Sequence, residues 1–215
     1  MKFSELLLDS QSQRAIASRI YGVVVGVVTN NQDPEGLGRV KVKYPWLSDE
    51  DESDWARIAV TMAGDKRGMY FIPEVNDEVL VAFEHGDVRF PYIIGALWNG
   101  EDKPPINNDD GENNVRMIKS RSGHVIRLND KEGEETIEIV DKTEKNSIVF
   151  DTATNTIAIT TEGDITLSAS QGNIKLEAQN IEIKSSADTK VESGAIMDIK
   201  ASSTMNLNGQ IINLN

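Results

Sequence analysis

Residues 164–184 read DITLSASQGNIKLEAQNIEIK, and this stretch decides the fold of the C-terminal half. Two apolar side chains stand two residues apart, as in Ile165 and Leu167, and a short polar turn follows. The pattern starts again at Ile174 and at Ile181. Side chains two apart along a strand share one face. Each repeat is therefore a short strand with one apolar face, closed by a turn.

The repeat continues to the end of the sequence with a step close to eight residues. The apolar pairs are Ile157 and Ile159, Ile165 and Leu167, Ile174 and Leu176, Ile181 and Ile183, Thr189 and Val191, Met197 and Ile199, Met205 and Leu207, and Ile212 and Leu214. Less regular pairs precede them at Ile126 and Leu128, Ile137 and Ile139, and Ile148 and Phe150. All the residues of the eight regular pairs except Thr189 are predicted to line a common interior.

The step length selects the architecture of that interior. One coil of a single-chain β-helix needs roughly 20 residues or more, so eight residues are too few. Three chains can close a core if each gives one strand per level and moves to the next face at each turn. The sequence therefore predicts an intertwined triple-stranded β-helix, a homotrimeric needle, roughly 40 Å long for eight strands at their usual spacing.

The residue between the two apolar members of each pair would point outward. These residues are Ala158, Thr166, Lys175, Glu182, Lys190, Asp198, Asn206 and Asn213. All but Ala158 are polar, and the middle four alternate in sign, which reduces repulsion between neighbouring strands.

The N-terminal half differs in composition. All three Trp, all four Tyr and four of the five Phe lie at or before Trp98. Strand patterns cover residues 20–28, 39–44, 55–60, 78–84 and 89–98, the last two joined by a loop at residues 85–87. Five strands in this length fit a small OB-fold barrel. We thus predict an all-β protein with four parts: an N-terminal segment (1–19) that fits a short helix, an OB-fold barrel (20–100), a linker (101–114) and the needle (115–215).

Composition limits the function. The chain has 215 residues, a net charge of −13 and no cysteine. The negative charge argues against nucleic acid or an anionic membrane as partner. We expect a soluble acidic protein made in the cytoplasm, because no apolar run reaches the roughly 18 residues of a membrane helix. His85 and His124 are predicted to be structural and the acidic residues 49–52 to form a solvated loop, so we expect no metal, no cofactor and no enzyme activity.

Several barrel motifs carry a family resemblance. They read GVVTNN (26–31), DPEGLGRVKV (33–42), YPWL (44–47), WAR (55–57), FIPEV (71–75), DEVLVAFEHGD (77–87) and GALWNG (95–100), followed by SGHVI (122–126) and ND (129–130). Together with the repeated apolar pairs, which we call the apolar ladder, they resemble phage baseplate assembly protein V and the valine–glycine-repeat (VgrG) proteins of type VI secretion. The resemblance implies the trimeric central spike of a phage tail, a tailocin or a related injection system, assembled into the baseplate and puncturing the target cell envelope when the sheath contracts.

Departures from the family refine the expected partners. Few residues precede the barrel, so the resemblance implies a separate hub protein, with Leu6, Leu7 and Leu8 either docking on it or folding back on the barrel. The linker is too short for a lysozyme domain, and the last residues lack the His-x-His motif of iron-binding tips. A separate tip protein of the PAAR kind is therefore expected to contact Asn213, Leu214 and Asn215.

Two other classes of function stay open. A trimeric receptor- or glycan-binding tail fibre or adhesin would share the β-helix but would need outward aromatic residues, and Phe150 is the one aromatic residue after Trp98. An enzymatic β-helix such as a polysaccharide lyase would need clustered acid–base groups and a longer repeat.

Overall fold

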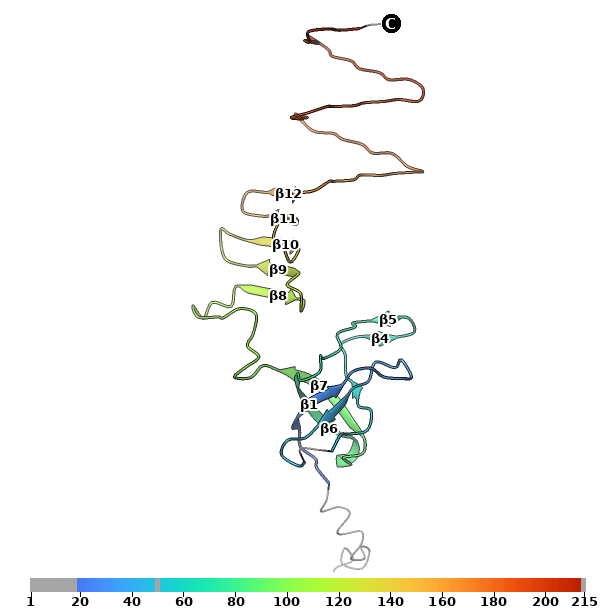
Figure 1. Ribbon diagram of the computed structural model, residues 1–215. Coiled ribbons are helices and arrows are strands. Elements are labelled where there is room, and N and C mark those ends of the chain that lie inside the picture. Colours follow the sequence, from blue (N-terminus) through green and yellow to red (C-terminus); the bar gives the residue numbers. More distant parts are fainter. Residues whose placement is uncertain (1–18, 49–50, 214–215) are drawn as a thin grey trace, which may run out of the picture. The chain divides into compact units, whose positions relative to one another are not determined.

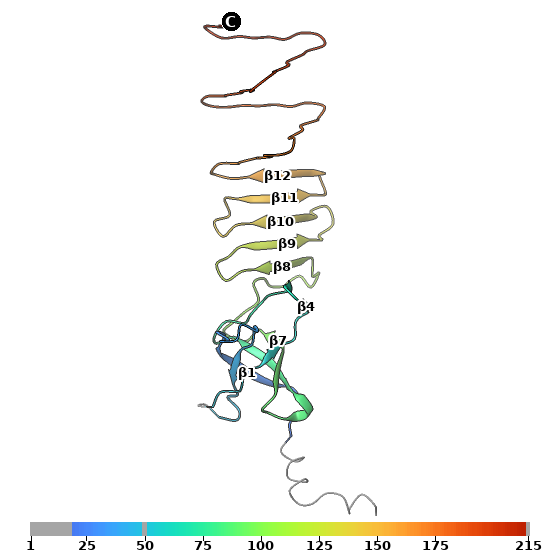
Figure 2. The ribbon, with the colours of Figure 1, turned by 90° about the vertical axis from the view of Figure 1, so that its right-hand side faces the viewer.

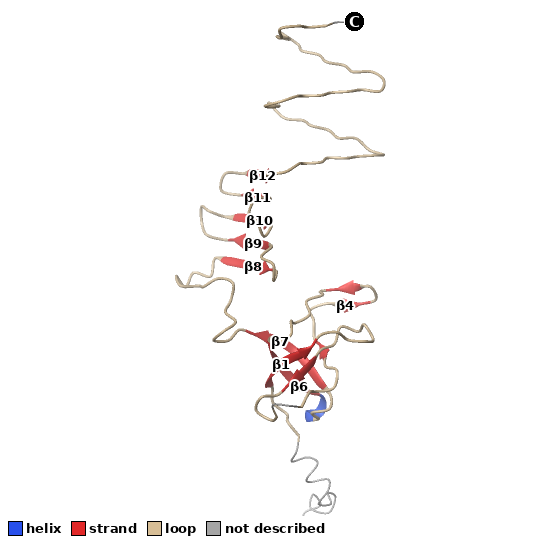
Figure 3. Cartoon of the chain, viewed as in Figure 1, coloured by secondary structure: helices blue, strands red, loops and turns tan. Residues whose placement is uncertain are grey.

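The computed structural model describes residues 19–48 and 51–213, and its regular structure is almost entirely β-strand (Figure 3). Within those ranges, the helical element is a single 3-10 turn, η1 (Glu84–Gly86). The chain divides into two units, Met1–Glu162 and Gly163–Asn215. The predicted all-β class is confirmed.

The first sheet of the N-terminal unit is a small barrel (Figure 1). Its strands are β1 (Val24–Asn30), β2 (Lys41–Lys43), β3 (Arg57–Ile58), β6 (Glu78–Phe83) and β7 (Pro91–Leu97). They follow the order β2-β1-β6-β7-β3, with β3 parallel to β7 and the other neighbours antiparallel. Isolated bridges Val40–Ala56 and Lys43–Glu52 join the β2 edge to the segment that leads into β3. The two edges of the sheet therefore meet, which gives the closed five-stranded architecture of an OB fold.

The barrel core is small and rich in valine. Alternate residues of β6 point inward, so Val79, Val81 and Phe83 are buried while the residues between them are partly exposed. The complete core cluster is Val28, Val40, Val42, Tyr44, Ala56, Val79, Val81, Phe83 and Ile93. Tyr44 meets Phe83 edge to face, with ring centroids 5.6 Å apart, and burial raises the pKa of Tyr44 to about 12.

The structure adds local features of the barrel that the sequence patterns did not define. The first strand begins at Val24, and its bulge lies between Val28 and Asn30. Gly26 has a packing role, because a Cβ there would lie 3.2 Å from the Val81 side chain. The segment after β3 carries an unpredicted hairpin of β4 (Ala63–Gly64) and β5 (Arg67–Gly68), two strands too short to leave an alternating pattern.

The loop between β1 and β2 is organised by one carboxylate. Asp33, with a side chain only 3% exposed, accepts backbone N–H groups of Glu35, Leu37 and Arg39 at 3.0–3.3 Å. It also accepts two bonds from the Arg39 guanidinium, at 2.7 and 2.9 Å. The guanidinium and the backbone donors hold the pKa of Asp33 well below its usual range.

We predict that Asp33→Asn lowers the melting temperature of the barrel at pH 7. The folded-state pKa is below the usual value of about 3.9, so the carboxylate stabilises the fold above that pH and loses this effect as the pH falls. The difference in melting temperature between wild type and variant, measured by tryptophan fluorescence, should decrease as the pH falls from about 4 to about 2. Glu35→Gln is the control, because Glu35 is largely exposed and forms an ion pair with the same Arg39 at 3.1 Å. A difference in melting temperature that stays constant with pH would contradict the stabilising role of the Asp33 carboxylate.

The second sheet of this unit is an antiparallel meander. It consists of β8 (Val115–Lys119), β9 (Val125–Asn129), β10 (Thr136–Val140), β11 (Ser147–Asp151) and β12 (Thr156–Thr160). Figure 2 shows these strands stacked in chain order. Each tight connection includes one residue with positive φ, namely Gly123, Gly133, Glu144 and Asn155. These turns reverse the chain, so each strand pairs with its neighbour in the same chain.

The second unit has a different path. Its extended segments form a wide, open coil (Figures 1 and 2). Within residues 163–213, no residue takes part in a β-ladder with another residue of the chain. Bends fall at 162–163, 170–172, 179, 186–187, 194–195, 202–203 and 210. Their spacing follows the step of about eight residues that the apolar pairs define.

Candidate functional site

The meander presents two rows of side chains on one face, and all of them except Arg116 are apolar. The strand register aligns Ile118, Ile126, Ile139, Ile148 and Ile159 in one row. The second row holds Arg116, Leu128, Ile137, Phe150 and Ile157. Both rows lie on the same face because their positions in each strand differ by two residues. The result is a continuous apolar surface across five strands.

This apolar face is open to solvent, which inverts the usual arrangement of a soluble sheet. The apolar residues of the two rows are 37–66% exposed, whereas the barrel core is at most 8% exposed. The opposite face carries polar groups such as the Arg127–Glu138 ion pair, and Glu138 also accepts a 2.9 Å bond from Thr136. Burying a large aliphatic side chain is worth about 1.5–3 kcal/mol, so a partner that covered both rows would gain many such contributions.

The second unit exposes the same kind of surface without the support of a sheet. Its paired apolar residues, from Ile165 to Ile212, are 45–76% exposed. Their backbone N–H and C=O groups form no intrachain ladder over residues 163–213. Unpaired strand edges of this kind are templates for strands from another chain. Apolar side chains and backbone edges together indicate a surface built for assembly.

The predicted interior residues fall in both units. Ile157 and Ile159 lie in β12, and their register continues the two rows of the meander. The other predicted residues from Ile165 to Ile212 lie on the extended segments of the second unit, and Asn213 is exposed there. Leu6, Leu7, Leu8, Leu214 and Asn215 lie outside the described residues.

Sequence reasoning missed part of the apolar face. Ile118 belongs to its first row but has a charged residue, Arg116, as its partner two positions earlier, so a search for apolar pairs passed over it. The spacing of the apolar pairs also did not show that residues 115–160 fold back on themselves. The signal lay in the turns, where Gly123 and Gly133 sit within five- and six-residue connections that suit chain reversal.

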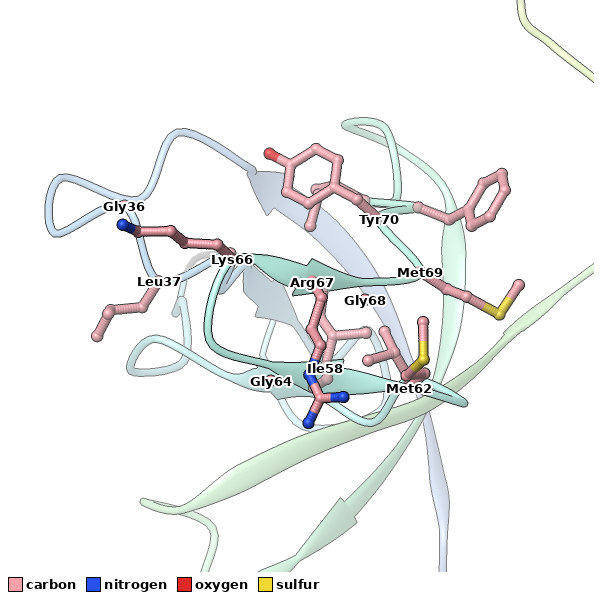
Figure 4. Close-up of a pocket in the computed structure, with 15 residues that line it drawn as sticks. Gly36, Leu37, Ile58, Met62, Gly64, Lys66, Arg67, Gly68, Met69 and Tyr70 are labelled. Carbon is pink, nitrogen blue, oxygen red and sulfur yellow. The ribbon is translucent and has the colours of Figure 1, made fainter.

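The barrel carries a shallow pocket of about 590 Å³ beside the β4–β5 hairpin. Figure 4 shows Met62 and Met69 on one side of it, with Tyr70 and Leu37 also on its rim. Its ionisable lining residues are Lys66, Arg67 and Tyr70, with no carboxylate or imidazole among them. The lining therefore lacks the paired acid and base groups that general acid–base chemistry uses.

Both histidines have structural surroundings. His85 lies in η1 with φ of 50°, and its backbone carbonyl accepts a 2.8 Å bond from Arg19. His124 Nδ1 accepts a 3.2 Å bond from the backbone N–H of Lys142, which ties two turns of the meander together. In residues 19–48 and 51–213, no three His, Cys, Asp or Glu side chains are grouped so that they could hold a metal ion. Over the same ranges, no helix is long and apolar enough to cross a membrane.

Comparison with known proteins finds similarity over the barrel and beyond it. Residues 24–98 match the type VI secretion system/phage-baseplate injector OB domain. The chain is 30% identical over 138 residues to the type VI secretion system spike protein VgrG1a of Pseudomonas aeruginosa, covering 59% of this chain and 22% of that protein. It is 33% identical over 135 residues to VgrG1b of the same organism, covering 58% and 18%. It is 35% identical over 95 residues to VgrG3 of Vibrio cholerae, covering 40% and 9%.

These matches confirm the N-terminal OB fold and the predicted family resemblance. Residues 24–98 match the injector OB domain, and the chain is similar over part of its length to VgrG spike proteins. The matched part spans about a fifth or less of the length of these relatives.

Proposed function

We propose that three copies of this chain assemble into the central spike of a contractile injection machine. The exposed apolar ladder carries this proposal, because a single chain leaves both its side chains and its strand edges uncovered. Three chains winding around one axis would bury the ladder and pair the edges with neighbouring chains. The similarity to spike proteins of type VI secretion systems supports the same function.

In this proposal, the two halves of the apolar surface are covered in different ways. Three meanders (115–160) pack their apolar faces together as the walls of a prism. The extended segments of residues 163–213 then intertwine, each chain giving one strand per level. The proposal keeps the four parts of the chain that the sequence predicts: the segment 1–19, the barrel 20–100, the linker 101–114 and the needle 115–215.

The proposed mechanism is mechanical. Sheath contraction supplies the force, and the needle transmits it to the target envelope. Resistance to unfolding comes from continuous backbone pairing, which leaves open edges only at the ends. A separate hub at the barrel end and a PAAR-like tip at the needle end complete the assembly, and the spike itself performs no reaction.

Deleting the gene in the organism that carries it tests this function. The deletion strain should still make sheath and tube proteins but should lose sheath-dependent delivery or infection, and a plasmid copy should restore it. Normal delivery by the deletion strain would overturn the proposal. A glycan array with the purified protein addresses the tail-fibre alternative, since selective glycan binding would favour an adhesin.

A further inference from the structure

The outward side chains of the second unit carry charges in a regular order. Four consecutive repeats each hold two opposite charges two residues apart. The pairs are Lys175 and Glu177, Glu182 and Lys184, Lys190 and Glu192, and Asp198 and Lys200. Each pair forms an ion pair within its own strand at 2.5–3.3 Å. The order of the signs reverses from each repeat to the next.

The apolar ladder has a weakness that these charges can correct. Every repeat offers nearly the same two apolar side chains, so a chain displaced by one whole repeat would still bury them. Register is weakly specified wherever a pattern repeats without distinctive features. Intertwined chains therefore need a second signal to select one alignment.

Resting on the proposed function, we propose that the charges form two interchain rows that fix the register of three identical chains. When each chain moves to the next face at each turn, a repeat lies beside the following repeat of a neighbouring chain. The two strands run parallel, about 4.8 Å apart. Lys175 then faces Glu182 of the next chain, and Glu182 faces Lys190.

The remaining contacts follow the same rule. Lys190 faces Asp198, which completes the first row. The second row runs through Glu177, Lys184, Glu192 and Lys200. Every contact in both rows joins opposite charges, which favours adjacent strands, whereas like charges directly opposite disfavour them.

A slip of one chain by one repeat removes the opposite-charge contacts that this chain makes and places like charges opposite each other at several of them. Lys175 would then face Lys175 or Lys190, and Glu182 would face Glu182 or Asp198. The side chains of these pairs are 69–82% exposed in the single chain, so they are accessible to a second copy. The matching sign reversal identifies the occupant of this surface as another copy of the chain.

The test exchanges the two charges of one central repeat in the full-length protein. Glu182→Lys combined with Lys184→Glu keeps the composition, the net charge, the apolar ladder and an opposite pair within the strand. It places like charges at all four neighbouring contacts of that repeat. After dilution from denaturant at low salt, we expect recovery of SDS-resistant trimer to fall about tenfold. At about 1 M salt, where the screening length is near 3 Å, recovery should approach wild type.

A second variant tests whether the alternation of charge signs matters, and not the identity of the individual residues. It exchanges the charges in all four repeats (K175E, E177K, E182K, K184E, K190E, E192K, D198K and K200D), which restores the alternation with every sign inverted. We expect its recovery to return to within about twofold of wild type, because its neighbouring contacts are again opposite.

The outcomes distinguish this inference from the proposed function. If the wild type forms a trimer and the variant with the single exchange recovers equally well, the register role alone is overturned. A fully exchanged variant that recovers no better than the single exchange would also overturn it. A wild-type protein that forms no trimer would overturn the register role together with the proposed function.

Discussion

Ile165→Asp should abolish the SDS-resistant trimer, whereas Thr166→Asp should leave it intact. The two residues are neighbours on one extended segment and point to opposite sides of it. Both are exposed in the single chain, so a chain that stayed alone would tolerate both changes equally. In the proposed needle, Ile165 lies at the axis and Thr166 faces water.

The expected effect of Ile165→Asp is large because it combines two losses in each of three chains. Removing a buried isoleucine side chain costs about 2–5 kcal/mol, and an unpaired buried carboxylate adds several kcal/mol more. Unheated SDS electrophoresis measures the amount of SDS-resistant trimer, and light scattering of the native protein gives its mass in solution. Equal behaviour of the two variants would place Ile165 on the surface and contradict the interior assignment.

Ending the chain at Glu162 should produce the second large effect. This cut follows the boundary between the two units, so the barrel and the meander keep all their strands. We expect a folded β-rich protein by circular dichroism that no longer resists hot detergent. Resistance is assigned to the backbone pairing of intertwined chains, which the shortened protein lacks.

The full-length protein is the control for that experiment, with the same detergent and heating series applied to both. If the shortened chain resisted as well as the full chain, resistance would come from the barrel or the meander. The extended segments of residues 163–213 would then not be the source of that resistance.

The sequence predicts the barrel well because its strands have alternating patterns. In the β6 region, residues 78–83 alternate inward and outward, and the structure places Val79, Val81 and Phe83 in the core. The β4–β5 hairpin escaped prediction because each strand has only two residues. Tertiary context, and not a local pattern, pairs such short segments.

The apolar ladder was predictable residue by residue, but its two folding modes were not. Ile137 and Ile139 look like a needle repeat, yet they lie in a meander whose turns reverse the chain. Ile174 and Leu176 have the same spacing and lie on an open segment. The difference resides in the connections, where a positive-φ residue such as Asn155 permits a reversal. The spacing of the apolar residues alone does not distinguish a meander from an open, extended segment.

The most direct test of the trimeric ladder is the solution mass of the purified full-length protein by light scattering. Three chains of 23.7 kDa predict a mass of about 71 kDa. A folded monomer of 23.7 kDa would contradict the account, because one chain cannot bury the ladder that the structure leaves exposed.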